Sequence, residues 1–134
     1  MAKPCYYVWN GYTVYLHYEV LFMRVAVVGS RSLTSIDLSP YVPAEATVIV
    51  SGGARGVDAC ARAYAQAHGL ALMEFLPDYP RYGRSAPLRR NRDIVAHADL
   101  LIAVWDGVSH GTAATIAFAR ELGVPVRVVQ VPVL

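Results

Sequence analysis

The sequence predicts an α/β domain in which an open, mostly parallel five-stranded sheet carries helices on both faces. Two observations lead to this fold class. Short apolar, β-branched runs alternate with segments of helical periodicity along the chain. Turns containing glycine follow several of these runs, as expected where a strand leads into a helix. With 134 residues, the chain is long enough for one such domain with a proper core.

Residues 1–22 are predicted to form an N-terminal β-hairpin extension, ahead of a main domain at residues 23–134. Asn10-Gly11 suits a type I′ turn between two aromatic and β-branched arms. A two-stranded hairpin alone is marginal in water, so we expect it to need a surface, and self-association through residues 5–22 into a homo-oligomer is our expectation. Two alternatives stay open: Met23 is an alternative start, or the segment before it is the remnant of a protease recognition site.

The remaining elements follow in order along the chain. Five strands are predicted, at residues 24–28, 47–50, 71–75, 99–105 and 126–129. Three helices are predicted, from about 56 to 68, from 87 to 97, and from 112 to about 122. Two loops are predicted, at residues 33–46, with at most a short helix near 35–41, and at residues 76–86. This alternation of strand and helix is typical of a Rossmann-like fold.

Composition narrows the class of protein. The chain is 55% hydrophobic, but no apolar run is long enough to span a bilayer and the N-terminus lacks the features of a signal peptide. We therefore expect a cytoplasmic protein without a membrane partner. Cys5 and Cys60 set no disulfide framework and are expected to be free thiols. No Cys/His spacing suggests a metal site, and we expect no cofactor other than a bound ligand.

The basic residues are unevenly distributed. The net charge of +2 is too small to argue for nucleic acid, and on this ground we do not expect a nucleic-acid partner. Of the twelve basic residues only Lys3 is lysine, and five arginines fall between Arg81 and Arg92. Arginine suits the forked recognition of phosphates and carboxylates. The alternative is a general preference for arginine in the composition of the genome.

The most informative stretch follows the second predicted strand. That strand ends in Ser51, Gly52, Gly53, Ala54, Arg55 and Gly56, and Asp58 then lies in the first turn of a helix. Glycines let backbone N–H groups approach an anion closely, and the helix dipole adds to the attraction. The alternative is an ordinary βα turn. In that case the carboxylate of Asp58 interacts favourably with the helix dipole and does not contact a ribose.

A second glycine-bearing turn follows the fourth predicted strand. It comprises Asp106, Ser109, His110, Gly111 and Thr112, and the threonine hydroxyl can cap the helix or touch a phosphate. Three roles stay open for His110: a hydrogen-bond donor to a phosphate, an acid, or a solvated loop histidine. Neither glycine turn matches the dinucleotide fingerprint or a P-loop.

Right-handed crossovers place every strand-to-helix turn at one edge of such a sheet. We therefore expect one site for a nucleotide-like ligand, which carries a phosphate and a ribosyl part. Beyond the two turns above, its binding residues would be Gly29, Ser30 and Arg31 after the first strand, with Arg89, Arg90, Asn91 and Arg92 on the second helix. Arg89 and Arg92 lie near one helical face and Arg90 points elsewhere. A solvated face is the alternative. A catalytic residue is not identified, and the candidates are Asp58, Asp106 and His110.

Four motifs together resemble the SLOG superfamily. They are Val-Val-Gly-Ser-Arg at 27–31, Ser-Gly-Gly-Ala-Arg-Gly-Val-Asp at 51–58, Arg-Arg-Asn-Arg at 89–92 and Trp-Asp-Gly-x-Ser-x-Gly-Thr at 105–112. The YspA/YpsA-type branch is the most similar, and the DNA-processing protein A and Lonely Guy families belong to the same superfamily. The resemblance covers about residues 24–130 and implies a Rossmann-like domain that binds or senses nucleotides or nucleotide-derived ligands.

One position departs from the Lonely Guy pattern. Those enzymes carry a glutamate three residues after the Gly-Thr pair and use it to cleave a phosphoribosyl N-glycosidic bond, whereas this chain has Thr115. The resemblance therefore favours binding of a nucleotide-derived small molecule over catalysis. Two alternatives remain: a phosphoribohydrolase of Lonely Guy type that uses another acid, and a DNA-associated module.

Overall fold

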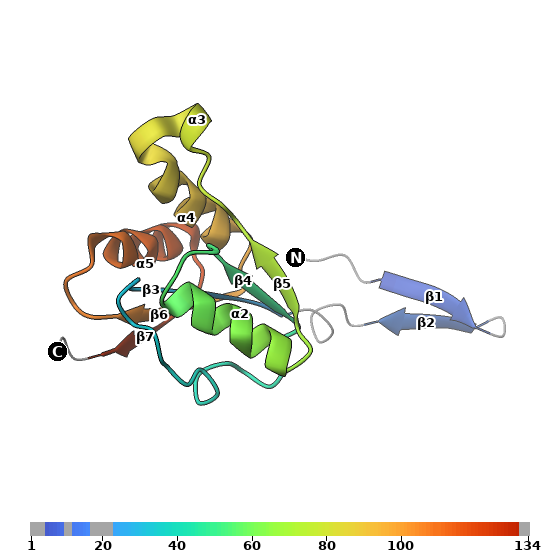
Figure 1. The fold of residues 1–134 in the computed structure, drawn as a ribbon. Coiled ribbons are helices and arrows are strands. Elements are labelled where there is room, and N and C mark those ends of the chain that lie inside the picture. Colours follow the sequence, from blue (N-terminus) through green and yellow to red (C-terminus); the bar gives the residue numbers. More distant parts are fainter. Residues whose placement is uncertain (1–4, 10–11, 17–22, 132–134) are drawn as a thin grey trace.

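The computed structural model describes residues 5–9, 12–16 and 23–131 of the chain. Five parallel strands form one sheet in the order β5-β4-β3-β6-β7 (Figure 1). They are β3 (Arg24–Gly29), β4 (Val48–Ser51), β5 (Ala71–Glu74), β6 (Leu100–Trp105) and β7 (Val126–Gln130). Three longer helices connect them: α2 (Val57–Ala67), α4 (Ala86–Ala96) and α5 (His110–Leu122). The predicted Rossmann-like α/β fold is confirmed.

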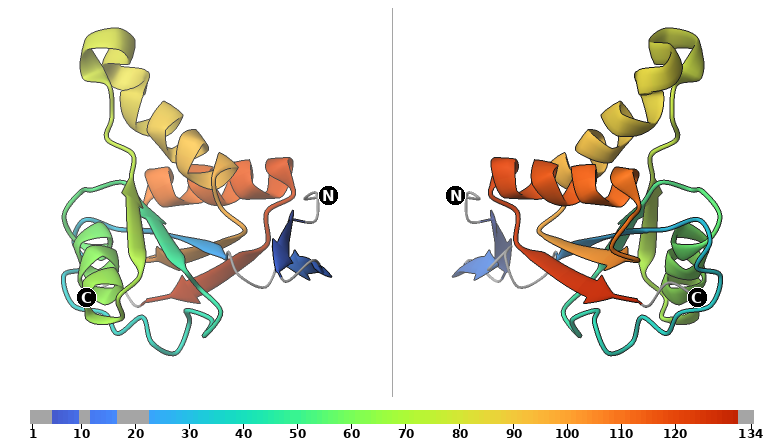
Figure 2. Two further views of the ribbon diagram at one scale, coloured as in Figure 1. Left: turned by 90° about the vertical axis from the view of Figure 1, so that its right-hand side faces the viewer. Right: turned by 90° about the vertical axis from the view of Figure 1, so that its left-hand side faces the viewer.

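Helices cover both faces of the sheet, with α2 on one face and α4 and α5 on the other (Figures 1 and 2). The central strand β3 shows why. Val25 and Val27 point into the core under α2, while Ala26 and Val28 point into the core under α4 and α5. All four are buried, as expected for a parallel strand covered on both sides. Because every strand is parallel, their carboxyl ends meet at one edge.

The segment between β3 and β4 covers part of the α2 face without forming a helix. Leu38 is buried in this core, and its carbonyl accepts hydrogen bonds from the amides of Tyr41 and Val42 at 3.0 and 3.1 Å. The short helix considered near residues 35–41 is therefore replaced by turns. Pro40 lies within these turns and Pro43 follows them, and neither can donate the backbone bond that a continuing helix needs.

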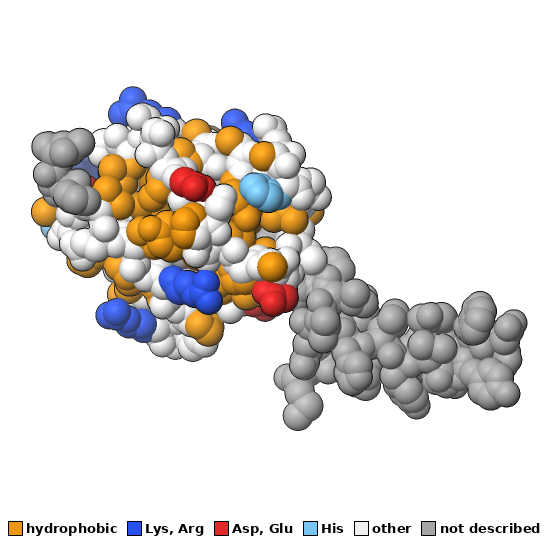
Figure 3. Space-filling view, turned by 90° about the horizontal axis from the view of Figure 1, so that it is seen from below, with side chains coloured by type: hydrophobic (Ala, Val, Ile, Leu, Met, Phe, Trp, Pro, Cys, Tyr) orange, Lys and Arg blue, Asp and Glu red, His pale blue; other side chains and the backbone are white. Residues whose placement is uncertain are grey.

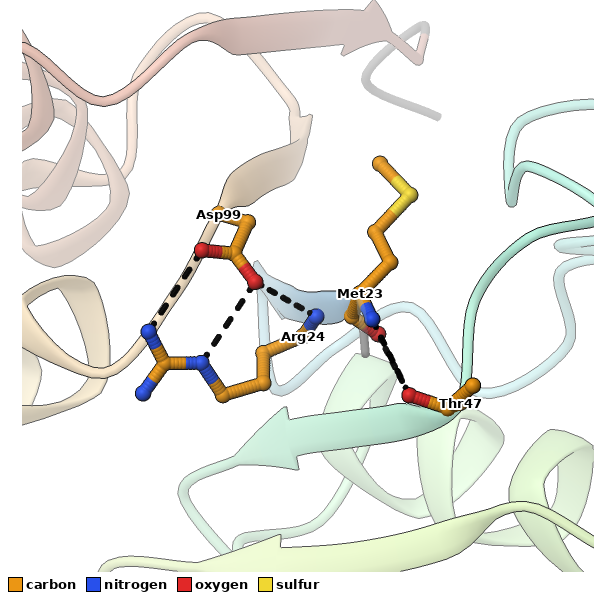
Figure 4. Close-up of polar contacts among 4 residues, drawn as sticks. All are labelled: Met23, Arg24, Thr47 and Asp99. Atoms are coloured by element: carbon orange, nitrogen blue, oxygen red, sulfur yellow. Dashed lines mark hydrogen bonds and ion pairs between the residues drawn. The ribbon is translucent and has the colours of Figure 1, made fainter. Parts of the chain in front are cut away.

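Side chains tie the strands together at the opposite, amino-terminal edge of the sheet (Figure 4). The Met23 amide donates to the hydroxyl of Thr47 at 3.0 Å, and the Arg24 amide donates to the carboxylate of Asp99 at 2.9 Å. The Arg24 guanidinium also reaches Asp99, but both side chains are about two-fifths exposed, so this ion pair contributes little. These contacts align the starts of β3, β4 and β6.

The segment after β5 differs from the prediction. Residues 76–86 were expected to form a loop, but they contain a short helix α3 (Tyr79–Tyr82) and a 3₁₀ turn η1 (Gly83–Ser85). Asp78 caps α3, since its Oδ1 accepts from the Arg81 amide at 3.2 Å. Residues 79–85, here called the arm, bury no side chain. They project beyond the sheet at the N-terminal end of α4 (Figure 2).

The predicted hairpin is present as a separate two-stranded sheet. Strands β1 (Cys5–Trp9) and β2 (Tyr12–Leu16) pair antiparallel, with Trp9 opposite Tyr12. The turn at residues 10–11 and the rest of the second arm, residues 17–20, lie outside the described residues, as do residues 21–22. Self-association through residues 5–22 therefore stays a prediction.

The surface seen from below in Figure 1 mixes apolar side chains with charges of both signs (Figure 3). Elsewhere, the loop between β3 and β4 is tied to β7, because the Tyr41 carbonyl accepts a hydrogen bond from Arg127 at 2.8 Å. Among the described helices, none combines the length and the apolar character that crossing a bilayer requires.

Candidate functional site

A cavity of about 680 Å³ opens at the carboxyl edge of the sheet. It lies where the ends of β3, β4 and β6 lead into their following segments, with one side of α4 as a further wall. Its lining comes from four separate parts of the chain: residues 28–32 with Thr34; Ala54, Arg55 and Asp58; Pro87, Arg90, Asn91 and Ile94; and residues 109–112 with Thr115. The sheet therefore brings together the segments that the sequence predicted to converge.

The wall at the start of α2 depends on a close contact between two backbones. The Val57 amide donates to the Ser30 carbonyl at 3.2 Å, which joins the first turn of α2 to the end of β3. Gly56, just before it, has a φ of 76°, and a Cβ there would lie 2.5 Å from the carbonyl oxygens of Ser30 and Arg31. Only glycine accommodates both the positive φ and this approach.

Two buried charged side chains, Arg90 and Asp58, line the cavity. Arg90 is 8% exposed, and its Nη1 donates to the carbonyls of Gly52 at 2.7 Å and Phe75 at 3.3 Å. Its Nε donates to Oδ1 of Asn91 at 2.9 Å. Asp58, also 8% exposed, accepts from the Ala54 amide at 3.1 Å. Arg90 thus ties the ends of β4 and β5 to α4.

Burial shifts the ionisation of both of these charged groups. Removal from water raises the pKa of Asp58, although the Ala54 amide, the Arg90 guanidinium and the Ser51 hydroxyl each oppose the rise. Removal from water lowers the pKa of Arg90, against the attraction of Asp58. Arg31 also lines the cavity, and its charge lowers the pKa of both groups. The site holds one carboxylate among several cations.

The N-terminus of α5 forms the opposite wall. Its N-cap residue, Ser109, makes no side-chain cap, because its hydroxyl donates instead to Oδ2 of Asp106 at 2.7 Å. The first-turn amides of α5 are therefore left for a ligand or for water, and no acidic residue lies in that turn. Thr112 is buried and lines the cavity, and no hydrogen bond among the described residues engages its hydroxyl. This wall can bind an anion.

Asp106 shapes the turn instead of facing the cavity. Its carboxylate accepts from the Ser109 hydroxyl and from the amides of Ser109 and Val108, at 2.7, 2.7 and 2.9 Å. These bonds, that of the Ser109 hydroxyl first, hold the pKa of Asp106 below its ordinary value of 3.8. With its acceptor capacity used in this way, Asp106 has a clear structural role.

The arm and the first turns of α4 carry further arginines beside the cavity. The guanidinium carbons of Arg81 and Arg89 lie 5.1 and 4.5 Å from the centre of the Tyr82 ring. Arg89 also donates to the Ser85 hydroxyl at 3.2 Å. Arg84 is exposed, and among the described residues none of these three arginines forms a salt bridge. The arm is thus a basic and aromatic surface continuous with α4.

The predicted site residues divide into two groups. The cavity is lined by twelve of them: Gly29, Ser30, Arg31, Ala54, Arg55, Asp58, Arg90, Asn91, Ser109, His110, Gly111 and Thr112. Outside the lining lie Ser51, Gly52, Gly53, Gly56, Arg89, Arg92 and Asp106.

The two groups differ most clearly on α4. The sequence analysis named four binding residues there, Arg89, Arg90, Asn91 and Arg92. The structure places Arg90 and Asn91 in the lining, leaves Arg89 outside it, and pairs Arg92 with Glu121 at 3.2 Å. The sequence reasoning also missed Ser32, Thr34 and Pro87 as lining residues. Their nearness in sequence to predicted residues was the only signal for them.

Two further observations bear on catalysis and metals. Thr115, which stands where Lonely Guy enzymes carry a glutamate, lines the cavity, but its hydroxyl donates to the Gly111 carbonyl at 2.8 Å. Within the described ranges, no three His, Cys, Asp or Glu side chains gather in a way that could hold a metal ion.

Comparison with known proteins identifies relatives of this chain. Residues 23–82 match the family described as the YspA, cpYpsA-related SLOG family. A protein of Mycobacterium tuberculosis, provisionally named DNA processing protein DprA in strains CDC 1551 and H37Rv, is 30% identical over 86% of this chain. The chain spans 39% of the length of that relative.

Solved structures share the fold. The crystal structure of DNA processing protein A from Streptococcus pneumoniae matches 80% of this chain and 50% of its own, with a TM-score of 0.63 and 25% identity. DNA processing protein A from Helicobacter pylori, a protein described for its binding of single-stranded DNA, matches 79% of this chain and 64% of its own, with a TM-score of 0.60 and 24% identity.

These relatives correct one expectation. The sequence analysis did not expect a nucleic-acid partner, but the relatives are DNA processing proteins and one of them binds single-stranded DNA. That expectation was wrong because it used net charge. A net charge of +2 averages over the whole surface and hides the local concentration of arginine on the arm and at the cavity.

Proposed function

We propose, from the match of residues 23–82 to the YspA, cpYpsA-related SLOG family and from the similarity to DNA processing proteins, that the chain is a DNA-processing-type module that binds single-stranded nucleic acid. One nucleotide of the strand occupies the cavity at the carboxyl edge of the sheet. Its phosphate lies at the N-terminus of α5 and faces the exposed guanidiniums of Arg31 and Arg55.

The observation that carries this proposal is the uncapped N-terminus of α5 inside a cavity with three arginines. Because the Ser109 hydroxyl is turned to Asp106, the first-turn amides of α5 remain free to bind phosphate oxygens. The buried hydroxyl of Thr112 offers a further donor at the same place. Two exposed arginines supply mobile positive charge, while Arg90 is fixed in the wall by the carbonyls that it binds.

The arm supports a strand in preference to a lone nucleotide. Arg81 and Arg84 alternate along it with Tyr79 and Tyr82, Arg89 follows on α4, and Tyr79 is 52% exposed. Arginine beside the exposed ring of Tyr79 suits the phosphates and unstacked bases of a single strand. The arm leads directly into α4, and α4 forms one wall of the cavity. A strand leaving the cavity would therefore meet these side chains next.

A free nucleotide-derived small molecule is the second candidate ligand. The size of the cavity favours it, since about 680 Å³ falls within the range of roughly 300–1,000 Å³ that is typical of small-molecule sites. Hydrolysis of such a ligand has less support, because Thr115 replaces the glutamate of Lonely Guy enzymes and its hydroxyl is bonded to Gly111.

Fluorescence anisotropy with a short labelled oligothymidylate tests the proposal. We expect the wild-type protein to bind it at low salt and to lose affinity as salt rises, with a logarithmic slope of about −0.7 for each phosphate contact. A double variant, Arg31→Ala with Arg55→Ala, should bind more weakly and with a shallower slope. Arg120→Ala removes an exposed arginine near the other end of α5 and serves as the matched control.

Three outcomes separate the candidates. Salt-dependent binding that the double variant loses and Arg120→Ala keeps supports the nucleic-acid module. Tight binding of mononucleotides without binding of the oligonucleotide selects the second candidate instead. Absence of any binding by the wild-type protein contradicts both.

A further inference from the structure

Asp58 is an unexpected residue for a phosphate-binding cavity. It is the one carboxylate among the residues that line the cavity, in a wall that also carries Arg31, Arg55 and Arg90. An ionised carboxylate repels a phosphate placed directly against it. A ligand that fills the cavity must therefore place a group other than its phosphate against Asp58, and a carboxylate favours a hydrogen-bond donor there.

The hydrogen bonds of Asp58 leave it with capacity to accept more. Its Oδ2 accepts from the Ala54 amide at 3.1 Å. The Ser51 hydroxyl, which also lowers the pKa of Asp58, is a second donor beside it. A carboxylate offers about four acceptor positions, so these two donors do not saturate it. Arg90 does not use the remainder, because its guanidinium donates to Gly52, Phe75 and Asn91, and no salt bridge joins it to Asp58. The free acceptor capacity faces a ligand that donates a hydrogen bond.

The position of Asp58 identifies the kind of donor. Asp58 accepts from the Ala54 amide and lines the cavity together with Arg31 and Arg55, so it lies among the groups that face the proposed phosphate. A donor at this place must be covalently close to a phosphate. In a nucleotide the sugar hydroxyls satisfy this condition, since they share the ring that carries the phosphate ester. The amino groups of the bases lie beyond the glycosidic bond.

We propose that Asp58 accepts a hydrogen bond from a free sugar hydroxyl of the bound nucleotide and so determines which sugar the cavity prefers. This inference rests on the proposed binding of a nucleotide unit. The hydroxyl has two sources: the 2′-hydroxyl of a ribonucleotide anywhere in a strand, or the 3′-hydroxyl at the end of a strand.

Matched oligonucleotides test the inference and distinguish the two sources. The dissociation constants of wild-type protein are measured for oligouridylate, for oligodeoxyuridylate with a free 3′-hydroxyl, and for oligodeoxyuridylate with a 3′-phosphate. If Asp58 binds a 2′-hydroxyl, oligouridylate should bind roughly tenfold more tightly than oligodeoxyuridylate, which is the effect of one hydrogen bond to a charged group. If Asp58 binds the 3′-hydroxyl at a strand end, oligodeoxyuridylate with a 3′-phosphate should lose a similar factor in affinity relative to the strand with a free 3′-hydroxyl.

Two variants and a control complete the experiment. Asp58→Ala should abolish the preference and bind the disfavoured strand at least as tightly as wild type, because a negative charge is removed from the cavity. Asp58→Asn keeps an acceptor for the Ala54 amide and should reduce the preference, which provides a second variant if Asp58→Ala unfolds. Asp37→Asn, in the loop between β3 and β4, is a matched control that should keep the wild-type preference.

The outcomes distinguish this inference from the proposed function. Equal wild-type affinities for the three strands overturn it while leaving nucleic-acid binding intact. A preference that survives in Asp58→Ala overturns it as well. If no strand binds to the wild-type protein, the proposed function fails, and the inference that rests on it fails with it.

Discussion

Asp58 and Asp106 are two carboxylates beside glycine turns at one edge of the sheet, and their surroundings shift their pKa values in opposite directions. Burial dominates at Asp58 and favours its protonated form. Three short hydrogen bonds dominate at Asp106 and favour its charged form. Identical side chains therefore make contributions to folding that depend on pH in opposite ways.

Asp106→Asn should destabilise the protein near neutral pH. The folded-state pKa of Asp106 lies below 3.8, so its contribution is fully present above that value and is lost as pH falls through the folded pKa. The difference in unfolding free energy between wild type and variant should therefore shrink as pH drops below about 3.8. Urea unfolding at a series of pH values measures it, and a difference independent of pH in this range would contradict the assignment.

Asp58→Asn should behave in the opposite sense. The folded-state pKa of Asp58 lies above 3.8, so the wild-type protein is favoured at low pH and loses this contribution as pH rises through the folded pKa. The stability of Asp58→Asn relative to wild type should therefore increase as pH rises from about 3.8 toward neutral. The same urea series tests this, and a relative stability that falls over that range would show that hydrogen bonds outweigh burial at Asp58.

At the scale of the element, α2 begins where two backbones touch. Gly56→Ala should strongly destabilise the protein, because a Cβ there would lie 2.5 Å from two carbonyl oxygens. Gly69→Ala is the matched control, since Gly69 also has a positive φ, 64°, but nothing lies within 4 Å of its added Cβ. The control should cost about 1 kcal/mol for the left-handed backbone alone. Equal losses in thermal unfolding would mean that the contact between α2 and β3 relaxes freely.

The helices and strands were largely predictable from the sequence, and the exceptions have physical causes. Periodicity and glycine turns located β3 to β7 and the three long helices, because burial on both faces leaves a clear apolar pattern. The arm was predicted as a loop because none of its side chains is buried, so it has no periodicity to detect. Its helical turn comes from a local cap by Asp78.

The orientation of α4 was the element-level detail that sequence could not provide. Spacing showed that Arg89 and Arg92 share a face, but not which face meets the sheet. Arg90 is buried because the carbonyls of Gly52 and Phe75 offer acceptors there, and these come from β4 and the end of β5. A guanidinium can occupy an interior position only when such partners exist, and they are visible only in three dimensions.

At the scale of the whole molecule, the candidate site joins segments that lie far apart in the chain, from residue 28 to residue 115. The convergence itself followed from the parallel topology, which the sequence predicted. The distribution of charge did not follow from it, because net charge describes no particular place on the surface. The arginines of the arm and cavity became a coherent surface only once the fold placed them together.

Binding at such a site should stabilise the whole fold. A ligand that bridges α5 and the turn after β3 binds the folded chain and not the unfolded one, and at a hundredfold excess over its dissociation constant it adds about 2.7 kcal/mol. Inorganic pyrophosphate should therefore raise the melting temperature of wild type, and the rise should shrink in the Arg31→Ala, Arg55→Ala double variant. An equal rise in both proteins would place the anion elsewhere.

The contact between Gly52 and Arg90 also constrains how this protein can change over time. A Cβ at residue 52 would lie 2.7 Å from Nη1 of Arg90 and 2.8 Å from Oδ2 of Asp58, so the glycine and the two side chains occupy one shared space. An alanine at residue 52 therefore requires both the Arg90 guanidinium and the Asp58 carboxylate to move, and shortening Arg90 removes only the first of these two clashes. Substitutions at residues 52, 58 and 90 are therefore expected to be epistatic, because each one changes the space that is left for the other two.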